Sequence, residues 1–201
     1  MKRSMQVGFA VLLGVVLAAP TMAHEAGQWI FRAGVGQVSP KSNNLTETVV
    51  DQGTTIDVAL NVDDGTSLTL MGTYMFTQNW GFDILASWPF KHDVKAGIAI
   101  DDGVNPPLSF SSKIAEVEHL PPTFSVQYHF LPDGTFQPYA GLGVNYTTFT
   151  SEKFVDIIVD GQNLGTLGDS LSLDDSFGVA AQVGGDWMLN DNWLVNLDVR
   201  W

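Results

Sequence analysis

The sequence predicts an all-β protein, specifically a transmembrane antiparallel eight-stranded up-and-down β-barrel. Apolar side chains recur at every second position in segments of about ten residues, the length that crosses a bilayer as a tilted strand. Only 15% of the 201 residues are charged, against roughly 25% in soluble globular proteins, whereas 11% are aromatic and 20 are glycine. Short turns alternate with long polar segments along the chain, as they do in outer-membrane barrels.

A signal peptide is expected before the barrel. Two basic residues precede an apolar run that ends at Pro20, and Thr21 and Ala23 place small residues at the −3 and −1 positions of a cleavage site. The run is shorter than the roughly 20 residues of a membrane-spanning helix, so the pattern is typical of a secretory signal peptide. We expect residues 1–23 to be removed by cleavage after Ala23 and residues 24–201 to form the barrel. An N-terminal membrane anchor is the alternative.

Seven strands are predicted after the cleavage site. They span residues 29–36, 68–76, 80–90, 123–130, 136–147, 176–187 and 193–201. In each strand large apolar side chains occupy one face, while the other face carries mainly glycine, threonine, serine and asparagine. A soluble β-sandwich, the alternative, would place lysine and glutamate on its solvated face. The alternation therefore favours a barrel whose large apolar side chains face lipid.

Aromatic residues near the strand ends are expected to form the girdles that lie at the two membrane–water interfaces. The predicted girdle residues are Trp80, Trp88, Phe136, Trp187 and Trp193.

The connections orient the barrel. Tight turns are predicted at residues 77–79, 131–135 and 190–192, and long polar loops at residues 41–65, 91–119 and 151–175. Outer-membrane barrels keep their short turns in the periplasm and their long loops outside, so the long acidic segments are expected at the cell surface. Their acidity indicates solubility, with divalent-cation binding as the alternative.

The strand count is odd, and an antiparallel barrel of this class has an even number of strands. An open edge in hydrocarbon would leave backbone N–H and C=O groups unsatisfied. Because Trp201 lies inside the last alternating run, we expect an eighth strand and the loop before it to be absent from this sequence. The alternative is a strand hidden between residues 41 and 65, where residues 54–62 alternate weakly.

Three apolar residues, Met71, Met75 and Leu85, fall on the lumen-facing parity of their strands and are the transport candidates. Methionine adapts to varied apolar ligands, which favours an apolar cargo. Simple packing is the alternative, because eight strands enclose just enough room for side chains.

Charged residues share the same inward parity deeper in the barrel. They are Arg32, Asp83, His129, Asp186, Asp198 and Arg200. Charges inside a barrel wall are expected to pair, so we predict a charge plug that blocks straight passage to the periplasm. Apolar cargo would then leave sideways through the wall.

Several function classes are excluded or disfavoured. The chain has no cysteine and a net charge of −13, which excludes thiolate chemistry and argues against a nucleic-acid partner. We expect no enzyme activity. A serine nucleophile needs a histidine base within hydrogen-bonding distance, and Ser125 and His129 share a face four residues apart, about 13 Å along a strand, which is too far. We also expect no metal and no cofactor.

Several motifs resemble the OmpW family of small outer-membrane proteins. They lie at residues 24–34, 120–123, 127–130, 138–141, 145–147, 175–178 and 192–196. The resemblance covers essentially all of residues 24–201 and extends to alkane-uptake relatives. It implies an eight-stranded barrel that continues past Trp201 and whose hydrophobic lumen passes small apolar molecules across the outer membrane. Arg200 departs from that pattern, since a bulky apolar residue would suit a constricted hydrophobic lumen better.

We therefore expect a Gram-negative outer-membrane channel for passive uptake of small hydrophobic molecules. The expected partners are outer-membrane lipid, lipopolysaccharide, small apolar solutes and the barrel assembly machinery. A monomer is expected because small lipid-facing residues are scarce. The alternative is a structural or receptor barrel whose acidic loops bind phage, toxins or cations without transport.

Overall fold

The computed structural model describes residues 10–17, 25–41, 46–51 and 54–201, and every regular element in these ranges is a β-strand. In chain order the strands are β1 (Ala10–Leu17), β2 (Trp29–Val38), β3 (Thr46–Asp51), β4 (Thr54–Val62), β5 (Gly65–Met75), β6 (Trp80–Ser87), β7 (Phe90–Asp101), β8 (Leu108–Leu120), β9 (Thr123–His129), β10 (Phe136–Phe154), β11 (Ile158–Val159), β12 (Gln162–Asn163), β13 (Ser176–Asn190) and β14 (Trp193–Arg200). No helix in the described ranges has the length and apolarity needed to cross a membrane.

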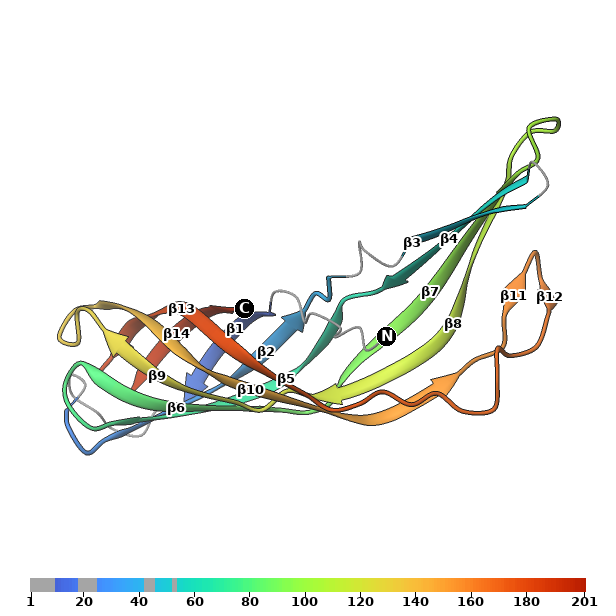
Figure 1. The fold of residues 1–201 in the computed structure, drawn as a ribbon. Coiled ribbons are helices and arrows are strands. Elements are labelled where there is room, and N and C mark those ends of the chain that lie inside the picture. The colour runs from blue at the N-terminus through green and yellow to red at the C-terminus, as the bar shows by residue number, and fades with distance from the viewer. Residues whose placement is uncertain (1–9, 18–24, 42–45, 52–53) are drawn as a thin grey trace.

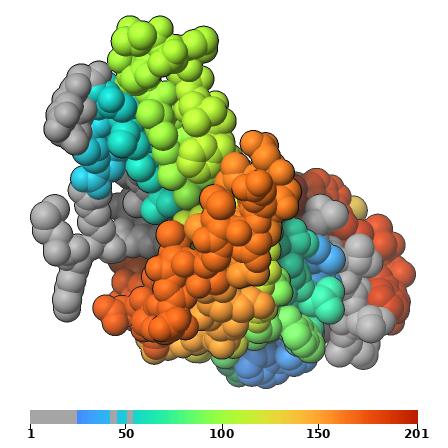
Figure 2. All heavy atoms as spheres, turned by 90° about the vertical axis from the view of Figure 1, so that its right-hand side faces the viewer, coloured from blue at the N-terminus to red at the C-terminus, as the bar shows by residue number. Residues whose placement is uncertain are grey.

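The strands form a barrel wall and a sheet that projects from it. Antiparallel pairings follow the order β13, β14, β1, β2, β5, β6, β9 and β10, and β10 pairs in addition with β13. The distal part of β10 pairs with β8, and the order then continues through β7, β4 and β3. Figure 1 shows this second group extending well beyond the barrel wall, with the β11–β12 hairpin beside it. Seen from that end, the orange atoms that follow β10 lie in front of the wall (Figure 2).

All seven strands predicted from the alternation are confirmed, as β2, β5, β6, β9, β10, β13 and β14. Their bounds differ where proline or pairing beyond the membrane intervenes. The strand predicted for residues 80–90 ends at Ser87, and a new strand begins at Phe90. Between them lies Pro89, which has no N–H to donate to a ladder. β10 runs on to Phe154 because its distal part pairs with β8.

The prediction of long loops was wrong for much of residues 41–65, 91–119 and 151–175. These segments contain β3, β4, most of β7 and β8, and the β11–β12 hairpin. Strands that pair beyond the membrane need no lipid-facing apolar row, so their sequence alternation is weak. The alternative strand at residues 54–62 exists as β4, but it pairs with β3 and β7 and not with an end strand of the barrel wall.

The apolar run of the predicted signal peptide is a strand in this structure. β1 pairs antiparallel with β14 over Ala10–Leu17 and with β2 over residues 10–14. The facing edges of β14 and β2 would otherwise present unpaired N–H and C=O groups, which an apolar strand rich in valine and leucine satisfies. The predicted cleavage position after Ala23 lies outside the described residues.

The predicted girdle residues all lie on the outward face, with exposed side chains. Trp80, Phe136, Trp187 and Trp193 lie beside the short turns, and Phe136 and Trp187 pack with ring centroids 4.3 Å apart. Trp88 lies at the opposite end of the wall, between β6 and β7. The outward apolar rows of the wall lie between these two levels.

Candidate functional site in the barrel interior

The interior is layered along the strands. Nearest the short turns, Ile30, Met75 and Leu194 pack into an apolar floor. The next inward positions of the same strands are Arg32, Thr73 and Asn196, which are all buried. Beyond them a second apolar pair, Met71 and Leu85, packs together across β5 and β6. A buried polar layer therefore separates two apolar regions, because inward side chains recur at every second position.

Arg32 and Asp186 form the first ion pair of this polar layer. The guanidinium donates through Nε to Oδ1 at 2.9 Å and through Nη2 to Oδ2 at 2.5 Å, a bidentate arrangement. Its third nitrogen, Nη1, donates to the Thr73 hydroxyl at 2.7 Å. Thr73 in turn donates to Asp83 at 2.8 Å. The Arg32 and Asp186 side chains are completely buried, so removing one partner would leave an uncompensated charge, at a cost of about 3–5 kcal/mol.

Arg200 forms the second ion centre. It donates through Nε to Asp198 at 2.6 Å and through Nη2 to Asp83 at 2.9 Å. Tyr139 also donates its hydroxyl to Asp198, at 2.8 Å. Asn196 donates to the Tyr139 hydroxyl at 3.0 Å and to Asp186 at 2.7 Å. The two ion centres are thus joined in one hydrogen-bonded network across the barrel.

His129, the remaining predicted member of the charge plug, is buried at the edge of this network. Its Nε2 lies 3.1 Å from the side-chain oxygen of Gln127, and its ring centroid lies 5.1 Å from that of Tyr139. The structure therefore brings all six predicted charged residues into the same layer, with His129 in ring contact with Tyr139.

Inward glycines make room for these large side chains. A methyl group at Gly184 would lie 2.4 Å from the Tyr139 hydroxyl, and one at Gly141 would lie 2.6 Å from the Gln182 amide nitrogen. Contacts this short exclude any residue larger than glycine at these two positions unless the neighbouring side chain moves. The mixture of glycine and polar residues on the inward face therefore reflects packing of the network.

The transport candidates are separated by the polar layer. Met71 and Leu85 lie together on its outer side, 4% and 5% exposed. The sulfur of Met71 lies 3.1 Å from Nη2 of Arg200. Met75 lies in the apolar floor on the other side. All three residues are buried on the inward face, but Met75 lies four residues from Met71 with the Thr73 level between them, so the candidates lie on both sides of the polar layer.

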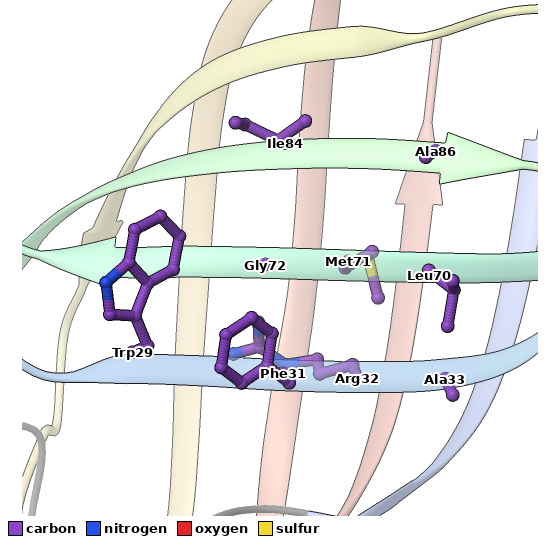
Figure 3. Close-up of a pocket in the computed structure, with 9 residues that line it drawn as sticks. All are labelled: Trp29, Phe31, Arg32, Ala33, Leu70, Met71, Gly72, Ile84 and Ala86. Atoms are coloured by element: carbon purple, nitrogen blue, oxygen red, sulfur yellow. The ribbon is translucent and has the colours of Figure 1, made fainter.

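A groove of about 380 Å³ lies on the outer face of the same part of the wall. Figure 3 shows its residues on the adjacent strands β2, β5 and β6, among them Gly72, Ala33 and Ala86, whose small size leaves the depression. The backbone ladders through it, from β2 to β5 and from β5 to β6, have no break. The groove is a depression in the lipid-facing surface, and the inward residues Arg32 and Met71 also contribute to its lining.

The wall ladder is interrupted at another place, beside Leu85. Pairing of β6 with β9 ends at Leu85 and Thr123, and pairing of β7 with β8 begins at Phe90 and His119. No register joins the residues between these two points in the described chain. Pro89, Pro121 and Pro122 lie there, and none has an N–H group to donate. Asn145 instead donates its side-chain amide to the carbonyls of Pro121 and Pro122, at 3.1 and 3.3 Å.

Sequence reasoning missed the residues that connect the ion centres, above all Tyr139, Asn196 and Thr73. Tyr139 lies two residues from both Gln137 and Gly141, so its parity alone would have placed it inside. Its partner Asp198 is 59 residues away, and only the curvature of the wall brings the two together.

Comparisons of sequence and of structure both find outer-membrane proteins similar to this chain. The OmpW family profile matches residues 25–201. Outer membrane protein W of Vibrio cholerae is 43% identical over 193 residues, 96% of this chain and 80% of that protein. Outer membrane protein W of Escherichia coli is 38% identical over 191 residues, 94% of this chain and 79% of that protein. The crystal structure of the outer membrane protein OprG from Pseudomonas aeruginosa superposes with a TM-score of 0.60 at 26% identity, covering 90% of this chain and 99% of OprG.

Proposed function

Because the chain belongs to the OmpW family of outer-membrane proteins, we propose that it is a channel for the passive uptake of small hydrophobic molecules. The observation that supports this most directly is the buried pair Met71 and Leu85 on the outer side of the polar layer. A water-filled pore would carry polar side chains at that depth. Apolar walls instead favour solutes that leave water readily.

The polar layer would stop the cargo from continuing straight to the periplasm. Arg32 and Asp186 close the barrel with a buried bidentate pair, and Arg200 links Asp83 to Asp198. An apolar molecule passing this level would have to break these bonds without offering replacements, which is costly for buried charges. Cargo would therefore move no deeper into the barrel than Met71 and Leu85.

We propose that cargo leaves sideways at the proline interruption. The unpaired stretch begins next to Leu85, so parting the wall there breaks fewer ladder hydrogen bonds than parting it at any fully paired site. Pro121 and Pro122 keep their carbonyls satisfied through Asn145. The exit would open beside Leu85, next to the girdle residue Trp88 at the membrane–water interface.

We propose that the barrel has eight strands, with residues 24–201 as its domain after removal of the signal peptide 1–23. β1 lies between β14 and β2 in this structure. Around the wall, membrane lipid and lipopolysaccharide would contact the aromatic girdles. The barrel assembly machinery would insert the chain, which would function as a monomer.

Polar substitution at Leu85 tests the proposed route. Cells expressing Leu85→Gln should take up a radiolabelled medium-chain alkane several-fold more slowly than cells expressing the unaltered protein, because a glutamine must be desolvated as cargo passes. Leu108→Gln is the matched control, since Leu108 is exposed on the projecting sheet, and it should leave uptake unchanged. Unchanged uptake in Leu85→Gln would favour a structural or receptor barrel that works through its surface segments.

A further inference from the structure

We propose that the interior beside Met71 and Leu85 selects neutral molecules that carry a hydroxyl group on an apolar body, with medium-chain primary alcohols as the class. The selecting groups are Arg200 and Gln182. This inference rests on the proposed channel function and names its preferred cargo.

One nitrogen of the Arg200 guanidinium lacks a hydrogen-bond acceptor in the part of the chain that the structure describes. Nε and Nη2 are committed to Asp198 and Asp83. Among the residues that the structure describes, Nη1 has no hydrogen-bond partner, although the side chain is only 5% exposed. An unsatisfied buried donor of a charged group is unfavourable. A cargo atom that accepts this hydrogen bond would therefore be stabilised in the interior.

Gln182 supplies the complementary acceptor. It lies directly opposite Arg200 in the β13–β14 register, so the two side chains leave the same face as cross-strand neighbours. Its amide nitrogen donates to the Ser125 hydroxyl at 2.7 Å. Within the described chain, its Oε1 has no hydrogen-bond partner and is buried. A hydroxyl group can accept a hydrogen bond and donate one through a single oxygen atom, so it has the chemistry to pair with both groups.

The apolar body of the cargo has a surface next to these two groups. The Met71 sulfur lies 3.1 Å from Nη2 of Arg200, and Met71 packs against Leu85. An alkyl chain attached to the hydroxyl would lie along this pair. An alkane beside this pair would leave both polar atoms unsatisfied.

Charge excludes an acid as the preferred cargo. Asp83 and Asp198 already contact the Arg200 guanidinium, at 2.9 and 2.6 Å. A cargo carboxylate bound to Nη1 would be the third negative charge around one guanidinium, and the carboxylates of Asp83 and Asp198 would repel it. A neutral hydroxyl meets no such repulsion.

The test compares initial uptake rates of radiolabelled octane, 1-octanol and octanoate in cells that express the full chain, each corrected for cells with an empty vector. The protein should accelerate 1-octanol most, octane less and octanoate least. Gln182→Met keeps the side-chain length and removes the acceptor. It should reduce the protein-dependent rate of 1-octanol roughly fivefold, the factor for one lost hydrogen bond, and leave that of octane unchanged.

Gln137→Met is the matched control, because Gln137 is a buried inward glutamine that lies near the short turns and donates to the Pro132 carbonyl. It should alter neither rate. Arg200→Lys is the second test, for use if Gln182→Met does not fold. It keeps the charge beside Asp83 and Asp198 but loses the forked donor, and it should likewise slow the protein-dependent uptake of 1-octanol.

Equal protein-dependent rates for octane and 1-octanol, with no effect of either variant, would overturn this inference and leave the channel standing. Faster uptake of octanoate than of 1-octanol would also overturn it. If no compound enters faster than it does with the empty vector, the proposed channel function itself is wrong.

Discussion

At the scale of single residues, the buried network depends on glycine as much as on charge. Tyr139 reaches Asp198 only because Gly184 opposite it has no side chain: a methyl group there would lie 2.4 Å from the tyrosine hydroxyl. The tyrosine hydroxyl then accepts a hydrogen bond from the side-chain amide of Asn196, which also donates to Asp186. A small inward residue is therefore as necessary to the polar layer as its ion pairs.

Gly184→Ala should lower the free energy of unfolding by about 1–3 kcal/mol, the usual cost of forcing extra volume into a packed interior. Gly178→Ala on the same strand is the control, because a methyl group at Gly178 has no neighbour within 4 Å among the described residues. Urea unfolding in lipid vesicles would measure both variants. Equal stabilities would contradict the packing role of Gly184.

At the scale of elements, sequence periodicity identified the strands that face lipid and missed those that do not. The seven wall strands carry a continuous row of large apolar residues, which the membrane requires. β7 and β8 pair beyond the girdle residue Trp88 and carry charges such as Lys91 and Glu116 among their apolar residues, so no single period stands out. Parity also predicted which charges face inward, but pairing Arg32 with Asp186, 154 residues away, requires the curvature of the wall.

The base of the projecting sheet should be sensitive to acid. His92 and His119 stack there with ring centroids 4.9 Å apart, and His92 Nδ1 lies 2.7 Å from the Asp63 carbonyl oxygen. Phe90 and Phe149 flank His119. Burial, together with the neighbouring His92, lowers the pKa of His119 to about 4, and burial also lowers the pKa of His92, although Asp63 and Asp64 act in the opposite direction.

Because the folded pKa of His119 lies below its unfolded value of about 6.5, the unfolded chain binds more protons between these values. The stability contributed by the neutral ring is complete above pH 6.5 and is lost as the pH falls toward 4. His119→Phe should reduce the slope of unfolding free energy against pH between 6.5 and 5. Hydrogen exchange of β7 and β8 amides at several pH values would measure this slope, and an unchanged slope would contradict the role given to His119.

At the scale of the whole molecule, the interior layers and the projecting sheet follow one another along the barrel. The sheet of β3, β4, β7 and β8 extends from the end that the long segments share (Figure 1). Inside the wall, the apolar pair Met71 and Leu85 is followed by the buried polar layer, and the proline interruption lies beside Leu85. This order is the basis for the route that we propose, with entry from outside and exit into the membrane.

The most direct measurement of the central claim is uptake of a radiolabelled medium-chain alkane by cells expressing the chain, beside a polar sugar of similar size and cells with an empty vector. We expect the protein to accelerate the alkane and to leave the sugar at the vector rate. Faster entry of the sugar would indicate a water-filled pore, and equal alkane rates with and without the protein would contradict a hydrophobic channel.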